Sequence, residues 1–435
     1  MAPTITPHLT HLFVSIINSQ IYPDTLKVTR ISPNLNSYKP FDNIDSYRPI
    51  CNLSVVDKIF QQYLKDHLNS FFEVHNIINS DHHGSRKSHS TTTALASIQH
   101  ITSTHYYNNK FTSIIQTDLS AAFDTVDHQI LLDKLSHYGI KGKENNLIKA
   151  ILTNRWQYVD IDGFSSTVTP ANPCSVLQGS KLSSLLYVIY CNEIPLLHKL
   201  VGSKIMPFMT NHGSNINTQN ISHNIVQYVD DSTNIIACTN THDLQNYINT
   251  YFNILEEFYN INKLLINSDK SKLLIITKPG QRHLSSNIKL QTTKYIINQS
   301  QKINILGIFI TSGFTNLANI NNTISKVNYR ISVLRELFKY STYRTKKILT
   351  NSIILSVIRY ASPILISSST NHLSKLQVMI MKCSRPILGI KSLKYSTQKI
   401  MNELNWLTIY QMVTKETILF FHKVVLLCSS VSLCM

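Results

Sequence analysis

The chain has 435 residues, of which 43% are hydrophobic, and its formal net charge at pH 7 is +17. This length indicates a globular protein of roughly two to four domains, each of about 100–200 residues with its own core. None of the seven cysteines sits in a C-x-x-C pair, so neither a disulfide framework nor a zinc knuckle is indicated.

The positive charge is concentrated toward the C-terminus. From residue 311 onward the sequence has sixteen Lys and Arg but only three acids, Glu336, Glu403 and Glu416. Cations on such a surface displace counterions from a phosphate backbone, so the expected partner is a nucleic acid whose binding weakens with salt. A generic basic surface is the alternative explanation.

The first informative strand is 111–117, a β-branched run that ends at Asp118, so this acid is expected at the end of a strand. A helix is predicted next, with Asp127 as its N-cap and Gly139 at its end. The apolar face of this helix consists of Leu131, Leu132, Leu135 and Tyr138.

Two short strands, 225–229 and 233–237, flank Asp230, Asp231 and Ser232, which predicts a hairpin with acids at its tip. The Asn-rich stretch 209–223 before it is expected to be a loop or an insertion, and 281–300 has a similar polar character.

The last third of the chain is predicted to be helical after a strand pair at 303–310 that breaks near Gly307. Runs 345–360 and 371–385 look helical, and Pro386 is expected to end its helix or to cost about 3 kcal/mol. A further helix has apolar residues spaced by four and three, namely Ile320, Ile324, Val327, Ile331 and Leu334. These elements predict an α+β catalytic body with an α-helical appendage.

The C-terminal tail 418–435 is the only long apolar segment, and His422 and Lys423 interrupt it. It is therefore predicted to be a truncated helix rather than a membrane span, which needs about twenty apolar residues. The N-terminus has no secretory pattern. An intracellular protein without a membrane role is expected.

Asp230 and Asp231 are adjacent acids, and like charges at close range repel unless a cation or solvent relieves them. Asp118 alone would more often be a cap or turn residue. Together, the three suggest phosphoryl transfer, in which two divalent ions about 3.5–4 Å apart activate a hydroxyl and stabilise the leaving group. Mg²⁺ prefers carboxylates, waters and substrate phosphates as ligands.

Several segments resemble, in chain order, the motifs of reverse transcriptases from jockey-like non-long-terminal-repeat retrotransposons. Tyr228-Val229-Asp230-Asp231 resembles their YxDD box, and 118–128 resembles their first palm motif. The other matching segments are 47–50, 83–90, 131–135, 138–140, 178–180 with 185–187, 264–272, 306–308 and 402–407. A lone YxDD would be weak support, but this ordered series covers nearly the whole chain.

The resemblance implies an RNA-directed DNA polymerase with a right-hand fold. Fingers are expected in residues 1–110, a palm in 111–310 with an Asn-rich insertion near 209–223, a basic helical thumb in 311–395, and a truncated C-terminal extension in 396–435. The expected partners are an RNA template, a DNA primer and deoxynucleoside triphosphates, in a nuclear or cytoplasmic ribonucleoprotein.

The resemblance also implies roles for the acids and for one lysine. Asp118 and Asp230 would bind two Mg²⁺ ions, with Mn²⁺ as an alternative, and Asp231 would assist. Lys270 would protonate the leaving pyrophosphate, although a lysine after a polar turn is usually only solvated. The primer-gripping hairpin would consist of Leu306, Gly307 and Ile308.

Four further residues are implied at the incoming nucleotide. Phe123 would be a steric gate against the 2′-hydroxyl, and an ordinary core ring is the alternative. Arg48 would bind the triphosphate, because guanidinium forks fit phosphate oxygens, or make a local salt bridge. Gln178 and Gly179 would lie near the nucleotide, or Gln178 would be a surface turn amide.

The sequence departs from the family at several points. Leu177 replaces the usual Pro before Gln178, and Ser183-Ser184 replaces a Gly-Pro, which puts the geometry of this turn in question. A rival hypothesis is therefore a catalytically decayed fragment that keeps only nucleic-acid binding. An RNA-templated RNA polymerase and a purely structural scaffold are further rivals. The histidines near Asp81, which are His82, His83 and His89, are interpreted as polar residues of the fingers rather than metal ligands.

Overall fold

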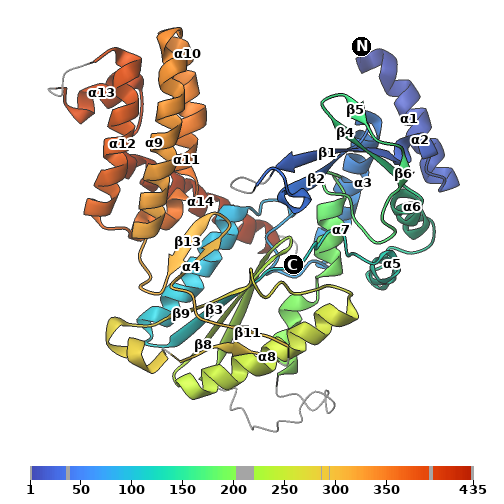
Figure 1. Ribbon diagram of the computed structural model, residues 1–435, viewed down its shortest axis with the longest axis horizontal. Helices are drawn as coiled ribbons and strands as arrows, with labels where there is room; N and C mark the ends of the chain where they lie inside the picture. The colour runs from blue at the N-terminus through green and yellow to red at the C-terminus, as the bar shows by residue number, and fades with distance from the viewer. Residues whose placement is uncertain are drawn as a thin grey trace.

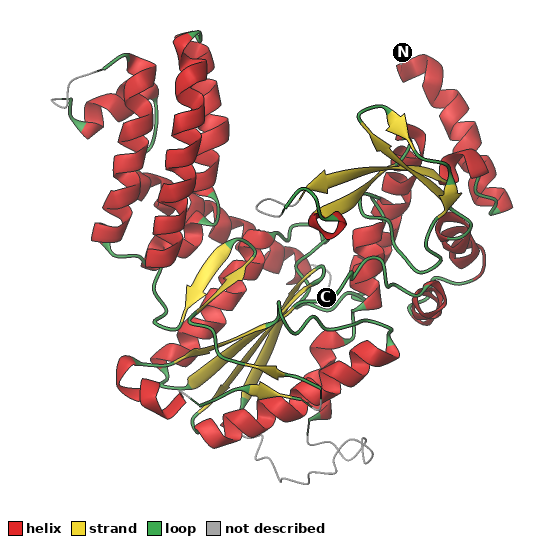
Figure 2. Ribbon diagram, in the orientation of Figure 1, coloured by secondary structure: helices red, strands yellow, loops and turns green. Residues whose placement is uncertain are grey.

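The computed structural model of the chain describes residues 2–35, 40–201, 220–285, 287–292, 294–390 and 395–432, with the side chains of 2, 45 and 426–432 left aside. Two arms stand on a common base (Figure 1). The base and the N-terminal arm each contain a sheet, whereas the C-terminal arm is helical apart from one hairpin at its root (Figure 2). The architecture is therefore α+β, as predicted.

The base is built on a four-stranded antiparallel sheet in the order β7-β8-β3-β9. Its strands are β3 (Phe111–Thr117), β7 (Ser222–Tyr228), β8 (Asp231–Cys238) and β9 (Lys272–Ile276). The predicted strand and the predicted hairpin are both confirmed. The turn of the hairpin consists of Val229 and Asp230, and Asp231 already belongs to β8.

Helices cover both faces of this sheet, with α4 (Thr91–Tyr107) on one face and α8 (Thr241–Ile261) on the other (Figure 1). Neighbouring residues in a strand point to opposite faces. Ile114 accordingly packs in the cluster that includes Leu95 of α4, and Ile115 in the cluster that includes Tyr251 of α8. Because both faces are buried, adjacent strand residues such as Ile114 and Ile115 are both apolar, and the polar residues of β3 that lie between helices, such as Thr112 and Ser113, are buried as well.

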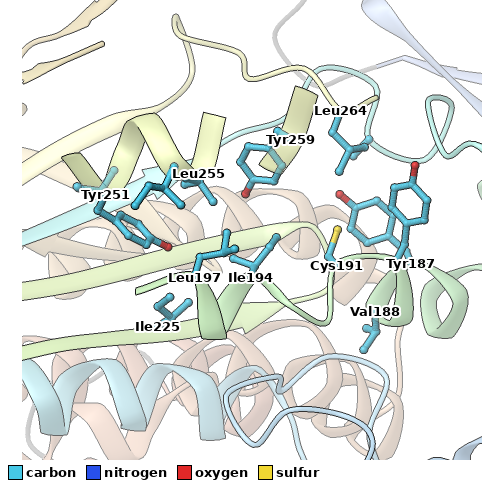
Figure 3. Close-up of a cluster of buried hydrophobic side chains, with 14 of the residues drawn as sticks. Tyr187, Val188, Cys191, Ile194, Leu197, Ile225, Tyr251, Leu255, Tyr259 and Leu264 are labelled. Atoms are coloured by element: carbon cyan, nitrogen blue, oxygen red, sulfur yellow. The ribbon is translucent and has the colours of Figure 1, made fainter. Parts of the chain in front are cut away.

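A third helix, α7 (Ser183–Tyr190), enters the same core, and all its side chains from Leu185 onward are buried. Figure 3 shows Tyr187 and Cys191 near Leu264, with Leu255 and Tyr259 of α8 in the same cluster. Fully burying one such large side chain contributes about 1.5–3 kcal/mol. This cluster fixes the position of the segment that precedes α7.

The N-terminal arm contains a second sheet in the order β2-β1-β4-β5, with β6 also paired to β4. Its elements are α1 (Ala2–Ser19), α2 (Asp24–Lys27), β1 (Val28–Leu35), η1 (Ile44–Ser46), β2 (Tyr47–Asn52), α3 (Val55–Val74), α6 (Gly142–Leu152), β4 (Trp156–Ile161), β5 (Phe164–Ser165) and β6 (Thr169–Pro170). Strand β4 pairs in parallel with β1, where Trp156 lies opposite Val28. Residues 156–170, predicted within the palm, thus complete the sheet of the predicted fingers. The division at residue 110 stays a prediction.

The helix predicted after Asp118 is confirmed as α5 (His128–His137). The Asp127 carboxylate accepts a hydrogen bond from the backbone N–H of Ile130 at 3.0 Å, which is the expected N-cap. Gly139 follows the helix with φ of +99°, in the region that favours glycine. The predicted apolar face is anchored by Leu131 and Leu135, which are fully buried.

The polar segment 281–300 is more ordered than the sequence suggested. It contains part of η4 (Pro279–Ser285) and a short antiparallel pair, β10 (Leu290–Gln291) and β11 (Ile296–Ile297), which packs against α8 through buried Leu290. Isolated apolar residues in a polar stretch gave no periodic signal. Of the predicted loop 209–223, residues 209–219 lie outside the described residues, and 222–223 belong to β7.

The C-terminal arm begins with the predicted strand pair, β12 (Lys302–Ile305) and β13 (Ile308–Thr311), and continues in helices with a core of their own. The helices are α9 (Leu317–Lys339), α10 (Tyr343–Leu349), η5 (Thr350–Leu355), α11 (Ser356–Arg359), η6 (Ser362–Ser367), α12 (Thr370–Leu388), α13 (Thr397–Leu404) and α14 (Ile409–Ser432). Pro386 lies in the last turn of α12, which ends at Leu388, so the predicted stop is correct to within one turn. Among the described residues, no helix combines the length and the apolar composition that a bilayer span requires.

Candidate active site

Three acids lie side by side at one end of the base sheet. Asp118 directly follows β3, and the last pair between β3 and β8 joins Thr117 to Ser232, the neighbour of Asp231. Asp230 lies in the turn between β7 and β8. Antiparallel pairing therefore brings together residues that are more than a hundred positions apart, as the sequence predicted.

The carboxylates influence one another electrostatically. Burial, followed by the charges of Asp230 and Asp118, raises the pKa of Asp231 to about 6. A hydrogen bond with Gln116 lowers this pKa and so opposes part of the rise. Desolvation by nearby protein atoms, followed by the charge of Asp118, raises the pKa of Asp230, and the charge of Arg48 opposes this rise. The residue itself remains partly open to solvent at the tip of the hairpin. Such mutual repulsion is what a bound cation would relieve.

The segment after α8 holds Asp118 in place. The backbone N–H of Asp118 donates to the Ser271 hydroxyl at 3.1 Å, and its carbonyl accepts from the N–H of Asn267 at 2.9 Å. Lys270 extends from the same segment, with Nζ 3.9 Å from Asp118 Oδ2 and the side chain largely exposed. The structure thus brings Lys270 beside Asp118.

The donor set fits hard divalent cations. Asp118 Oδ2 is buried without a hydrogen-bond partner, which leaves a lone pair free for a cation. No group of three or more His, Cys, Asp and Glu side chains in the described part of the chain is arranged to hold an ion by itself. Mg²⁺ at phosphate-transferring sites typically takes one or two carboxylates and completes its shell with waters and substrate phosphates. Two carboxylates on neighbouring strand ends are sufficient for that pattern.

Phe123 follows Asp118 by five residues in the sequence and stacks on the buried ring of Tyr187, with ring centroids 5.0 Å apart and an interplanar angle of 19°. The ring is half-buried, so one part packs in the core and another faces outward. Beside it, Gln178 Nε2 donates to Asp124 Oδ2 at 3.4 Å. The segments of Phe123 and Gln178 therefore meet, although their sequence positions are far apart.

The turn around Gln178 forms without the usual proline. The N–H of Ser180 donates to the carbonyl of Leu177 at 3.1 Å and closes it. Gly179 has φ of +119°, and a Cβ added there would lie 2.5 Å from the carbonyl oxygen of Cys51 in β2. The Cys51 N–H also donates to the Gln178 carbonyl at 2.8 Å. Only glycine fits this contact, which ties the turn to the strand that carries Arg48.

A buried polar network that the sequence did not reveal contacts this turn through Ser180. Asp57 of α3 forms an ion pair with Arg155 at 3.2 Å, and both side chains are almost fully buried. The Asp57 carboxylate also accepts from the Tyr22 hydroxyl at 2.6 Å and from Gln61 Nε2 at 2.5 Å. Gln61 in turn accepts a hydrogen bond from the Ser180 hydroxyl. No local pattern marks these residues, because the partners come from distant segments.

The hairpin expected to grip the primer consists of β12 and β13. Leu306 and Gly307 form its turn with φ of +47° and +82°, as a two-residue hairpin turn requires. The Tyr360 hydroxyl donates to the Leu306 carbonyl at 2.5 Å, and Ile308 begins β13. The hairpin sits at the root of the C-terminal arm (Figure 1), and its hydrogen bonds reach that arm rather than the three acids.

Two histidines of the segment between α3 and α4, His82 and His83, are polar residues without charge. His82 is fully buried, and burial lowers its pKa to about 3. Burial likewise lowers the pKa of His83 to about 4, and its Nδ1 lies 3.0 Å from the Thr93 hydroxyl. Both imidazoles are therefore neutral at pH 7.

Known proteins similar to this chain act on nucleic acids. The probable RNA-directed DNA polymerase from transposon BS of Drosophila melanogaster is 20% identical over 422 residues, which cover 94% of this chain and 43% of that protein. The RNA-directed DNA polymerase from mobile element jockey of the same organism is 24% identical over 389 residues, or 87% of this chain and 39% of that protein. The chain thus spans about two fifths of the length of these relatives.

Among solved structures, a telomerase from Candida albicans in complex with a fragment of telomeric RNA is 12% identical, with a TM-score of 0.45. The match covers 92% of this chain and 70% of that one. The sequence profile of the family described as "Reverse transcriptase (RNA-dependent DNA polymerase)" matches residues 38–310, which include all three acids. The resemblance and the right-hand α+β fold that it implied are confirmed, and the chain belongs to the reverse transcriptase family.

Proposed function

We propose that this chain is an RNA-directed DNA polymerase that extends a DNA primer on an RNA template with deoxynucleoside triphosphates. One observation carries the proposal: Asp118 follows β3, Asp230 and Asp231 lie at the turn between β7 and β8, and the charge of Asp118 is close enough to raise the pKa of both of these acids. Such carboxylates have a use where metal-bound phosphates are transferred. Because the substrate includes RNA, the protein is expected to work in an intracellular ribonucleoprotein, in the nucleus or the cytoplasm.

In this proposal Asp118 and Asp230 bind two Mg²⁺ ions, or Mn²⁺ as an alternative, and Asp231 assists from the start of β8. When bound, the two ions activate the primer 3′-hydroxyl and stabilise the leaving pyrophosphate. Lys270 donates a proton to that pyrophosphate. Its ammonium lies 3.9 Å from Asp118 Oδ2, which supports the role because the lysine is within reach of the same phosphates.

The nucleotide is held by residues from two segments that the structure joins. Arg48 binds the triphosphate, which its charge effect on Asp230 supports. Gln178 and Gly179 lie beside the nucleotide, in the turn that contacts the backbone of Cys51. The hairpin turn of Leu306, Gly307 and Ile308 guides the primer from the root of the C-terminal arm.

A primer-extension assay tests the proposal. The purified chain is given a DNA primer annealed to an RNA template, deoxynucleoside triphosphates and Mg²⁺, beside an Asp230→Ala control. Extension by the wild type and none by the variant supports the polymerase. Equal background in both, together with salt-dependent binding of the RNA–DNA duplex, identifies instead the decayed fragment that only binds nucleic acid.

Sugar selection depends on Phe123 in this proposal. Replacing Phe123 with Ala removes the ring that stacks on Tyr187, so a 2′-hydroxyl no longer meets a steric barrier. We expect the preference for deoxynucleotides over ribonucleotides, measured as a ratio of kcat/KM, to fall by about tenfold or more. Phe164→Ala is the matched control, because Phe164 is exposed on β5. An unchanged ratio in Phe123→Ala would exclude this ring as the gate.

A further inference from the structure

The segment 77–86, between α3 and α4, packs against the turn that carries Asp230. Strand β7 is one of the two edge strands of the base sheet. The N–H of its Gln227 donates to the carbonyl of Asp81 at 2.9 Å, and the N–H of His83 donates to the carbonyl of Gln227 at 2.8 Å. Both backbone groups of Gln227 are thus satisfied by segment 77–86 rather than by β8, two residues before the turn.

Gly84 approaches the turn more closely than a residue with a side chain could. A Cβ added to Gly84 would lie 2.5 Å from the backbone nitrogen of Val229, 2.6 Å from its Cγ2 atom and 3.2 Å from the carbonyl carbon of Tyr228. Gly84 is buried, and its backbone is outside the left-handed region. The close approach alone therefore requires glycine at this position.

The turn needs such support. Val229 has φ of +57°, a left-handed conformation that is unfavourable for a β-branched residue. Strained conformations of this kind persist only when the surrounding structure holds them. Gly84 contacts the backbone of Val229 directly, so segment 77–86 is positioned to hold the residue that precedes Asp230.

Segment 77–86 is itself fixed on both sides. Arg86 forms a bidentate pair with Glu73 of α3, with Nε to Oε1 and Nη2 to Oε2 both at 2.8 Å. Nη1 of Arg86 also donates to the carbonyls of Asn79, at 3.1 Å, and His82, at 3.3 Å. One guanidinium thus joins α3 to the backbone of segment 77–86, in the planar geometry that only arginine offers.

On the opposite side, Asn192, which follows α7, binds the beginning of the same segment. Its Nδ2 donates to the carbonyl of Ile77 at 2.8 Å, and its Oδ1 accepts from the N–H of Asn79 at 2.9 Å. Asn192 is buried. The segment is therefore anchored to the core of the base as well as to the N-terminal arm.

We propose that segment 77–86 is a brace that fixes the Val229–Asp230 turn, and that Gly84 and Arg86 are positioning residues for Asp230. The catalytic consequence rests on the proposed polymerase function, whereas the brace itself does not. A methyl group at position 84 pushes the turn away and loosens the hydrogen bonds of Gln227. Loss of the Arg86 fork loosens the segment without touching the turn.

Hydrogen–deuterium exchange of the peptide 222–232 tests the brace in Gly84→Ala. The matched control is Gly280→Ala, because a Cβ at Gly280 meets nothing within 4 Å. We expect faster exchange in this peptide for Gly84→Ala and wild-type exchange for Gly280→Ala. Exchange at the wild-type rate in Gly84→Ala overturns the brace. If Gly84→Ala does not fold, Arg86→Lys decides by the same peptide, with faster exchange expected and an unchanged rate against the proposal.

Kinetics then separate positioning from general damage. A displacement of Asp230 by about 1 Å lowers kcat by about 100-fold, while KM for the nucleotide and Kd for the template–primer stay within twofold of wild type. A higher Mg²⁺ concentration for half-maximal rate is expected as well. A Gly84→Ala enzyme with wild-type kcat would contradict the positioning role. If the wild type itself is no more active than Asp230→Ala, the polymerase function fails, and the exchange result still decides the brace.

Discussion

Replacing Asp230 with Asn is expected to abolish primer extension, with a fall in kcat of about 1,000-fold or more. The amide is nearly isosteric but has no charge, so the variant keeps the shape of the turn and loses a metal ligand. Metal ions supply several kcal/mol of transition-state stabilisation, and each 1.36 kcal/mol corresponds to about tenfold in rate. Single-nucleotide incorporation under single-turnover conditions measures the effect.

Asp133→Asn is the matched control for Asp230→Asn. Asp133 is an exposed acid on α5 that accepts a hydrogen bond from Gln129 of the same helix. This variant is expected to keep wild-type kcat. Comparable kcat in Asp230→Asn and wild type would show that the turn is not the metal site, whatever nucleic-acid binding remains.

Breaking the buried pair between Asp57 and Arg155 should have the largest effect on stability. Arg155→Met removes the cation beside Asp57 and leaves Tyr22 and Gln61 as the donors to this carboxylate among the described residues, at a position with no access to water. Removing one partner of a buried ion pair typically costs about 3–5 kcal/mol. We expect the free energy of unfolding of the N-terminal arm to fall by that amount.

The sequence provides its own probe for this measurement. The chain has two tryptophans, and Trp156 directly follows Arg155. In a Trp406→Phe background, urea unfolding followed by tryptophan fluorescence therefore reports on the N-terminal arm. The control is Lys339→Met, which breaks the exposed pair of Lys339 with Glu336 and should change stability by about 0.5 kcal/mol or less. If both variants unfold at the same urea concentration, the buried pair does not stabilise the arm.

The predictions that succeeded rest on local patterns. A β-branched run ending at Asp118 and two short strands around Asp230 identify strand ends by their composition and by the polar residues that follow. Asp127 and Gly139 marked the ends of α5 by the chemistry of helix caps. In each case the residues that determine the structure are neighbours in the sequence.

The features that were missed depend on contacts between distant segments. The burial of Asp57 against Arg155 follows from packing, and neither residue lies in a recognisable pattern. The close approach of Gly84 to Val229 joins two distant segments, and no local pattern around Gly84 indicates it. The short pair β10–β11 was overlooked because few apolar residues mark it. Periodicity predicts an element but does not say which other element it pairs with.

The pairing of β4 with β1 also has a consequence for how the protein is made. Val28 leaves the ribosome long before Trp156, its partner across the sheet, has been synthesised. Until then the edge of β1 that pairs with β4 exposes unpaired backbone groups to other chains, which is an aggregation hazard. Asp57 likewise has no ion-pair partner until Arg155 has been synthesised. Pairing over so long a stretch of chain is slow. The N-terminal arm is therefore expected to depend on chaperones during translation, and an isolated fragment 1–110 should aggregate.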